Sequence, residues 1–181
     1  MIIRQATPED IPEIKRIVDD LQVSREQCDW QTKTSGLFEY PKTEQELYVS
    51  LNPWFTVAET SQGIRAYSLA YDSNFFKRQF KDTTYPEWEN ILSQSGNFLY
   101  WDQIGVLNSD SLGAGRIVNT LADKTLRIAR SGILEKAFAY VCEKPLHNLR
   151  SANFLRRKGF IRVQEVPIEN KVVLAMYELT M

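Results

Sequence analysis

The chain has 181 residues, of which 43% are hydrophobic and 25% are charged. This composition is typical of one globular domain with a sizeable core, and it excludes a disordered chain. Lys and Arg number 22 against 23 Asp and Glu, for a net charge of -1, which gives no electrostatic argument for a nucleic-acid or anionic-membrane partner.

The cysteines and the histidine limit which disulfides and metal sites the chain can form. Cys28 and Cys142 lie far apart in the sequence, and the first residues do not have the pattern of a signal peptide. We therefore expect reduced thiols and a cytoplasmic protein. His147 is the single histidine, so no metal site is expected. No apolar run reaches the roughly 20 residues that span a bilayer, so no membrane partner is expected.

The spacing of apolar residues predicts alternating strands and helices along a single domain, residues 1–181. In chain order, strands are predicted at 1–6, 54–60, 64–73, 98–106, 136–143, 160–166 and 171–181. Helices are predicted at 7–21, 43–51, 116–132 and 146–159, with an aromatic and partly helical insert at 74–96. Residues 22–42 have no clean period and are expected to form a loop or a broken helix. The strand–helix–strand unit at 98–142 predicts one parallel crossover, while the hairpins predict antiparallel pairs, so the sheet should be mixed.

Two of the predicted helices have recognisable start signals. Thr7 and Asp10 have the spacing of a capping box, with Pro8 at the first helical position. Thr43 and Glu46 repeat the same spacing before the second helix. Both pairs predict where the backbone turns into a helix.

The segment 109–121, SDSLGAGRIVNTL, places two glycines one residue apart between a predicted strand and a predicted helix. A helix N-terminus presents free N–H groups, and glycines before it let a phosphate approach the backbone. Arg116 adds a cation, so we predict a phosphorylated ligand, with a turn that simply needs positive φ angles as the alternative. The phosphate-loop lysine is missing, and Val118 stands where a dinucleotide fingerprint has its third glycine. Both facts weaken the interpretation as a nucleotide-binding protein.

The element order and two separate motifs resemble the GNAT superfamily of acyl-CoA-dependent N-acetyltransferases. The first motif is a strand ending in Ile104-Gly105-Val106, followed by the turn 110–115. The second motif consists of an Asn, a small residue three positions later and a Gly-Phe pair that closes the helix, here Asn148, Ser151, Gly159 and Phe160. The resemblance covers nearly the whole chain. It implies an α/β (mixed α+β) fold: a central mixed, mostly antiparallel sheet of about seven strands flanked by about four helices, with a helical insert before the fourth strand.

The resemblance also implies a function. The chain should be an acyltransferase that moves an acetyl group from acetyl-CoA to a primary amine by direct attack in a ternary complex. The acceptor would be a small molecule or a peptide, and a homodimer is left open. The alternative is a non-catalytic acyl-CoA-binding or regulatory module with the same fold.

The cofactor-binding residues implied by the resemblance fall into three groups. Backbone amides of the turn would hold the pyrophosphate of coenzyme A, namely those of Leu112, Gly113, Ala114, Gly115 and Arg116. Backbone groups at the splayed strand end would pair with the pantetheine arm, namely those of Ile104, Gly105 and Val106. Asn148 and Ser151 would contact the cofactor from the start of the last helix.

Two positions depart from the family pattern. Asp110 stands where Arg or Gln is usual, and an acid beside a pyrophosphate is unfavourable unless it points away. Leu155 stands where a tyrosine often serves as general acid, and leucine cannot donate a proton. Both departures favour the non-catalytic alternative.

Two residues of the fourth main strand are candidates for catalysis. Asp102 is the candidate base, because strand alternation should place it on the same face as Tyr100 and Ile104. The alternative is that Asp102 orients a loop or pairs with a cation. Tyr100 is a candidate proton donor, with a role as a packed wall of the site as its alternative.

Overall fold

The structure is a computed structural model of the chain. The residues that it describes are 1–23, 37–38, 42–82, 84–107, 113–132, 134–145, 147–168 and 172–181.

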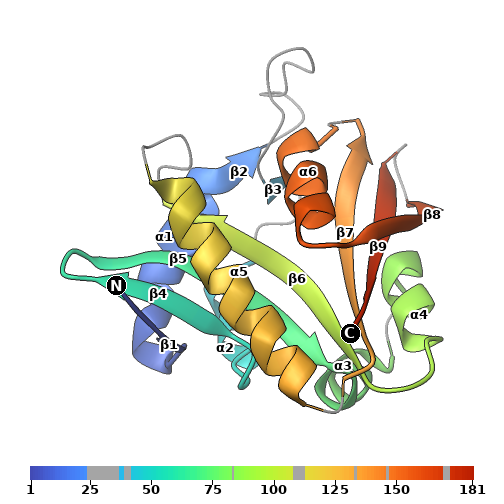
Figure 1. Cartoon of the computed structure of the whole chain (residues 1–181), viewed down its shortest axis with the longest axis horizontal. Coiled ribbons are helices and arrows are strands. Elements are labelled where there is room, and N and C mark those ends of the chain that lie inside the picture. Colours follow the sequence, from blue (N-terminus) through green and yellow to red (C-terminus); the bar gives the residue numbers. More distant parts are fainter. Residues whose placement is uncertain are drawn as a thin grey trace.

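A seven-stranded sheet forms the centre of the molecule (Figure 1). Its spatial order is β1 (Ile2–Gln5), β4 (Thr56–Thr60), β5 (Gly63–Asp72), β6 (Phe98–Val106), β7 (Lys136–Lys144), β9 (Val173–Thr180) and β8 (Ile161–Pro167). The β6–β7 pair is parallel, and the other neighbouring pairs of this sheet are antiparallel. The predicted mixed, mostly antiparallel sheet is therefore confirmed.

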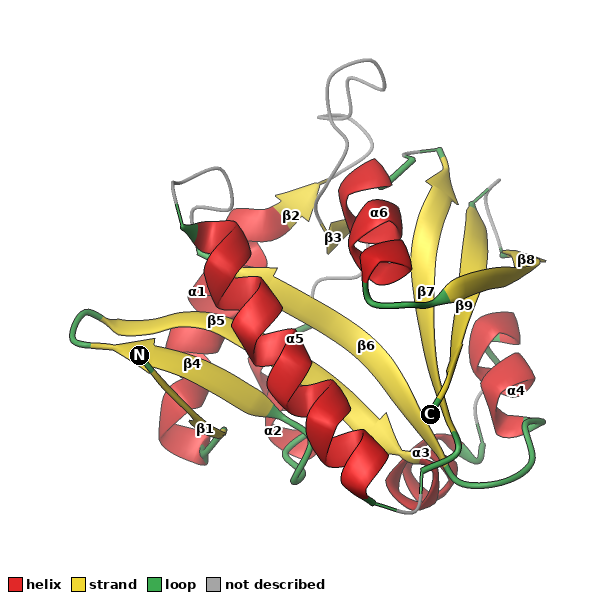
Figure 2. Ribbon diagram, in the orientation of Figure 1, coloured by secondary structure: helices red, strands yellow, loops and turns green. Residues whose placement is uncertain are grey.

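Helices cover both faces of the sheet (Figure 2). They are α1 (Ile11–Leu21), α2 (Glu44–Val49), α3 (Ser73–Phe80), α4 (Pro86–Leu92), α5 (Ala114–Ser131) and α6 (Leu149–Arg157). Helices α5 and α6 lie on one face, and α1 to α4 lie on the other. No helix in the described part of the chain is long and apolar enough to cross a membrane.

The two predicted capping boxes explain how two helices begin. Asp10 Oδ2 accepts a hydrogen bond from Thr7 N at 2.8 Å, and a short 3-10 turn (Pro8–Asp10) leads into α1. Before α2, Glu46 N donates to Thr43 Oγ1 at 3.2 Å, while Thr43 N donates to Glu46 Oε2 at 2.7 Å. Each pair satisfies backbone donors that the first turn would otherwise leave unpaired.

Two segments are more regular than the sequence predicts. The segment expected to be a loop or broken helix contributes β2 (Gln22–Val23) and β3 (Leu37–Phe38), which form a small parallel pair. The insert before β6 forms the two helices α3 and α4. Asp72 caps α3 by accepting a hydrogen bond from Phe75 N at 2.8 Å.

A separate hydrophobic core lies on each face of the sheet. The core under α1 to α4 is rich in aromatic rings, and Phe76 is at its centre, with ring contacts to Phe98 and Tyr100. The core under α5 and α6 contains Trp101 and Phe160, together with many alanines that let α5 approach the sheet closely. Strand β6 contributes side chains to both cores, and it lies at the centre of the candidate active site.

Candidate active site

Strands β6 and β7 are paired only over the first part of their length. The parallel register runs from Phe98↔Lys136 to Trp101↔Ala139. Strand β6 then continues to Val106 while staying paired with β5, and the two parallel strands diverge toward the ends nearest α5 and α6 (Figure 1). Among the described residues, the β7-facing backbone groups of β6 beyond Trp101 therefore lack a strand partner. An open strand edge of this kind can pair with an extended, amide-containing ligand.

A β-bulge lies at the point where the strands separate. Leu69 is opposite Gln103 and Ala70 is opposite Trp101, so Asp102 is the extra residue of β6. A bulge shifts the alternation of the residues that follow it. The shift places Asp102 and Gln103 on the same face.

The bulge corrects one prediction. Asp102 does share the face of Tyr100, since both contact Tyr71. Ile104, however, packs against the core under α5 and α6, on the opposite face. The predicted common face for Asp102 and Ile104 is therefore wrong, because simple alternation fails across an extra residue.

Asp102 lies in a largely buried polar network. Its Oδ2 is 2.9 Å from Lys42 Nζ, and the two side chains are 13% and 12% exposed. The same oxygen accepts a hydrogen bond from the Tyr71 hydroxyl at 3.3 Å, and the Ser50 hydroxyl lies 2.9 Å from the Tyr71 oxygen. Burial and the nearby Asp102 charge hold the pKa of Tyr71 well above its usual range.

Tyr100 forms part of an aromatic wall beside this network. It is 4% exposed, stacks on Tyr71 with ring centroids 6.3 Å apart, and makes edge contacts with Phe76 and Tyr140. Burial, followed by the charge of Asp102, raises the pKa of Tyr100 well above its ordinary value. A tyrosine in this setting keeps its proton at neutral pH, so it can donate a hydrogen bond or a proton but cannot serve as a base.

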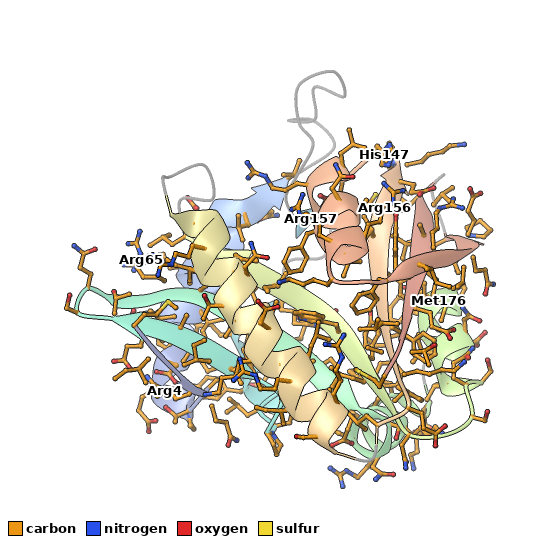
Figure 3. All side chains as sticks on the ribbon, in the orientation of Figure 1. Arg4, Arg65, His147, Arg156, Arg157 and Met176 are labelled. Atoms are coloured by element: carbon orange, nitrogen blue, oxygen red, sulfur yellow. The ribbon has the colours of Figure 1, made fainter. Side chains whose placement is uncertain are left out.

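Three residues across the divergence from Asp102 were not predicted from the sequence. Tyr140, the first residue of β7 beyond the paired region, donates a hydrogen bond to the backbone oxygen of Glu87 at 3.0 Å. Asn90 Nδ2 donates to the Tyr140 hydroxyl at 2.9 Å, and it also lies 3.2 Å from the sulfur of Met176, which is labelled in Figure 3. Burial raises the pKa of Tyr140 to about 12. Glu87 and Asn90 lie on α4, in the insert, where the sequence has no period that would indicate a functional face.

The glycine turn leads directly into α5. Gly113 has a φ of 95° and occupies the cap position, so the backbone is left-handed there. The amides of Ala114 and Gly115 precede the first bond of the helix, which Arg116 N donates to the Gly113 oxygen at 3.0 Å. A Cβ added at Gly113 or Gly115 would meet no described residue within 4 Å. Space is therefore available beside these amides. Asp110 and Leu112 lie outside the described residues.

Gly105 has a different explanation from the glycines of the turn. It pairs with Tyr67 across β5 and β6, and a Cβ on Gly105 would lie 2.5 Å from Tyr67 Cε1 and 2.9 Å from Leu21 Cδ1. The Tyr67 hydroxyl in turn donates to Gln103 Oε1 at 2.9 Å. The glycine is required because a ring packs over the strand, while the flanking Val106 is buried against α5.

The second sequence motif forms the start and the end of α6. Asn148 Oδ1 caps the helix by accepting a hydrogen bond from Ser151 N at 3.0 Å. Leu155 is 5% exposed and belongs to the core under α5 and α6, so the position that often holds a tyrosine has a packing role here. Gly159 ends the helix with a φ of 91°, and Phe160 is buried in the same core.

The outer side of α6 is basic. His147 just before the helix and Arg156 and Arg157 in its last turn are all exposed (Figure 3).

Among the described residues, no three His, Cys, Asp or Glu side chains gather in a way that could hold a metal ion.

Solved structures show the same architecture across the whole chain. Arabidopsis thaliana NAA60, solved with acetyl-CoA, is 13% identical, with a TM-score of 0.67 and coverage of 99% of each chain. The ribosomal-protein-alanine N-acetyltransferase of Brucella melitensis is 16% identical, with a TM-score of 0.63 and full coverage of both chains. The Drosophila melanogaster polyamine N-acetyltransferase, which forms N-acetylagmatine, is 12% identical, with a TM-score of 0.61 and coverage of 99% of each chain.

These likenesses establish the fold. The chain has the GNAT fold, as its sequence motifs predict. No protein-family profile and no curated protein sequence matches the chain. At identities this low, the shared architecture does not by itself transfer a reaction or a substrate.

Proposed function

We propose that the chain is an acetyl-CoA-dependent N-acetyltransferase that acts on a primary amine of a small molecule or a peptide. The observation that carries this proposal is the open edge of β6 beyond Trp101, which leads toward the free amides at the start of α5. An extended amide-containing arm with a diphosphate at one end matches that combination. Acetyl-CoA has both features, and NAA60, of the same fold, has been solved with it.

The residues of the chain fit such a cofactor in three places. The diphosphate would lie against the amides of residues 112–116, where partial positive charge and open space beside the glycines favour an anion. The pantetheine amides would pair with the backbone of residues 104–106. Asn148 and Ser151 would line the other side from the start of α6, whose first turn they order by capping.

Acetyl transfer from a thioester to an amine needs little acid catalysis. When bound, acetyl-CoA supplies a thioester whose carbonyl carbon is attacked by the amine nitrogen, with loss of one amine proton and cleavage of the C–S bond. A thiol has an ordinary pKa of about 8.5, so a thiolate is a tolerable leaving group without a strong acid. Leu155 at the frequent tyrosine position is therefore compatible with turnover. Tyr100, which keeps its proton, remains a candidate donor.

Asp102 remains the candidate base, and Lys42 is in contact with its carboxylate. The Lys42 ammonium stabilises the Asp102 carboxylate at 2.9 Å. As a base, Asp102 would take the amine proton directly or through a water molecule while its Oδ2 atom contacts Lys42. The alternative role, that of pairing with a cation, is the one that the described contacts already support.

Two measurements test this function. Calorimetry should detect binding of coenzyme A and acetyl-CoA, without competition from ATP or NAD. A thiol-release assay with acetyl-CoA and a panel of alkylamines, amino acids and peptide N-termini should detect turnover. Binding without turnover over the whole panel would instead identify the non-catalytic module, and a folded protein that does not bind coenzyme A would refute both.

A further inference from the structure

A buried carboxyl group without a cation lies beside the point where β6 and β7 diverge. Glu87 is 8% exposed, and its Oε2 is buried without a hydrogen-bond partner among the described residues. Asp10 is buried to a similar extent, but Arg4 lies 2.6 Å from its carboxylate. Burying an ionised carboxylate without a partner is strongly unfavourable, even after the surroundings relax. Such a group binds either a proton or a positively charged ligand.

The position of Glu87 connects it to the candidate active site. Its backbone oxygen accepts the hydrogen bond from Tyr140, and the Tyr140 ring lies 6.2 Å from that of Tyr100, centroid to centroid. The Glu87 charge contributes to the raised pKa of both Tyr100 and Tyr140, so the carboxylate is within electrostatic reach of both hydroxyls. Tyr100 and Tyr140 come from β6 and β7, immediately before and after the place where the strands part.

The surroundings of Glu87 favour a cation as its ligand. The only titratable side chains that adjoin Glu87 through described contacts are the tyrosines Tyr140 and Tyr100, which carry no positive charge. Asp102, the other carboxylate on this face, already has Lys42 as its partner. Burial also raises the pKa of Glu87 itself, as expected for a carboxyl that lacks a compensating charge.

We propose that Glu87 binds the ammonium group of the acceptor and makes this site selective for basic alkylamines over weakly basic arylamines. Alkylamines, with pKa values near that of lysine at about 10.4, and peptide α-amines near 8 are cations at neutral pH. An uncharged arylamine cannot form the charge-assisted hydrogen bond with the Oε2 atom. This inference rests on the proposed N-acetyltransferase function, and it names the binding residue and the chemical class of the acceptor.

The test compares Glu87→Gln with Glu89→Gln, an exposed carboxyl on the same helix. Both variants are near-isosteric, and removing an unpaired buried charge should leave E87Q well folded. The substrates are benzylamine, an alanine-terminated tripeptide amide and aniline, each with acetyl-CoA. For the first two, E87Q should lower kcat/KM roughly 10- to 100-fold, mainly through KM, which corresponds to one charge-assisted hydrogen bond. The KM for acetyl-CoA should not change, and E89Q should behave as wild type.

A second readout does not depend on turnover. With coenzyme A present, benzylammonium chloride should raise the melting temperature of the wild type and of E89Q, but not of E87Q, and uncharged benzyl alcohol should raise none of them. If thiol release is never observed, this shift still supports or refutes the role of Glu87. Three results would overturn the proposed role of Glu87. They are equal amine KM values in E87Q and wild type, equal melting shifts in these two proteins, and a wild type whose melting temperature responds to none of the ammonium probes.

Discussion

Lys42 Nζ lies 2.9 Å from Asp102 Oδ2, and both side chains are nearly nine-tenths buried. The two residues come from different parts of the chain, one at the entrance to α2 and the other in the bulge of β6. The ion pair therefore fixes the segment before α2 against the strand that carries the candidate site. It also places a positive charge beside the candidate base.

Asp102→Asn should destabilise the fold. The substitution leaves the Lys42 ammonium buried without its counterion, and removing one partner of a buried pair costs about 3 kcal/mol or more. Lys42→Met should cost a similar amount, since it leaves Asp102 unpaired. The double variant should recover much of the loss. Urea unfolding of the four proteins gives the coupling free energy, and additive losses would mean that the contact contributes little.

The same two variants separate the catalytic from the structural role of Asp102. If Asp102 is the base, thiol release by D102N should fall about 100-fold or more, while K42M should keep most of its activity when both are assayed fully folded. D102N should also lose the part of the pH profile of kcat that reports the base, whereas K42M should keep it. Equal losses in D102N and K42M, with unchanged pH profiles, would assign Asp102 a positioning role only.

Gly105→Ala should destabilise the sheet through a steric clash. The new methyl group would meet the Tyr67 ring at 2.5 Å and Leu21 at 2.9 Å, and overpacking of this kind costs about 1–3 kcal/mol. Gly132→Ala is a suitable control, because its nearest neighbours, the backbone oxygens of Ala129 and Ile128, lie at 3.6 Å. Thermal unfolding should show a lower melting temperature for G105A alone. A stable G105A would show that Tyr67 and Leu21 can move aside.

Gly115→Ala should separate stability from cofactor binding. The added methyl group meets nothing within 4 Å, and alanine favours a helix over glycine by about 0.5–1 kcal/mol, so the protein should be at least as stable. The same methyl group occupies the space in which the proposed diphosphate approaches the amides. Calorimetry should therefore show binding of coenzyme A weakened about tenfold or more, the cost of one hydrogen bond to a charged group. Unchanged affinity would place the diphosphate elsewhere.

The structural features that could be predicted from the sequence are those formed by residues close together in the chain. Thr43 and Glu46 define the start of α2 because a capping box is complete within four residues. The glycine turn before α5 and the Gly-Phe pair after α6 are also local, and both are found where the sequence predicts a turn, with left-handed backbone at Gly113 and Gly159. Together with the order of the predicted strands and helices, the glycine turn and the Gly-Phe pair produce the family resemblance from which the fold is predicted.

The contacts that define the candidate site depend on tertiary packing. The bulge at Asp102 is a property of the register between β5 and β6, so alternation within one strand could not predict it. Lys42 ends an aperiodic segment and gives no sign of its partner 60 positions later in the chain. Glu87 and Tyr140 are joined by a hydrogen bond from the Tyr140 hydroxyl to the backbone oxygen of Glu87, and no spacing rule connects these two residues.

The pH dependence of stability gives an independent test of the buried Glu87 carboxyl. In the unfolded chain Glu87 loses its proton near the ordinary value of 4.5, whereas burial raises its pKa in the folded protein. The folded state thus binds the proton more tightly, and stability falls as the pH rises from about 4.5 through the raised pKa. Asp10, whose pKa is lowered by Arg4, acts in the opposite sense and at lower pH, where stability is lost as the pH falls. Subtracting the unfolding free energy of Glu87→Gln from that of wild type cancels such common contributions. Urea titrations at several pH values between about 4 and 8 should give a difference that decreases with pH. A difference that does not change with pH would mean that burial does not raise the pKa of Glu87.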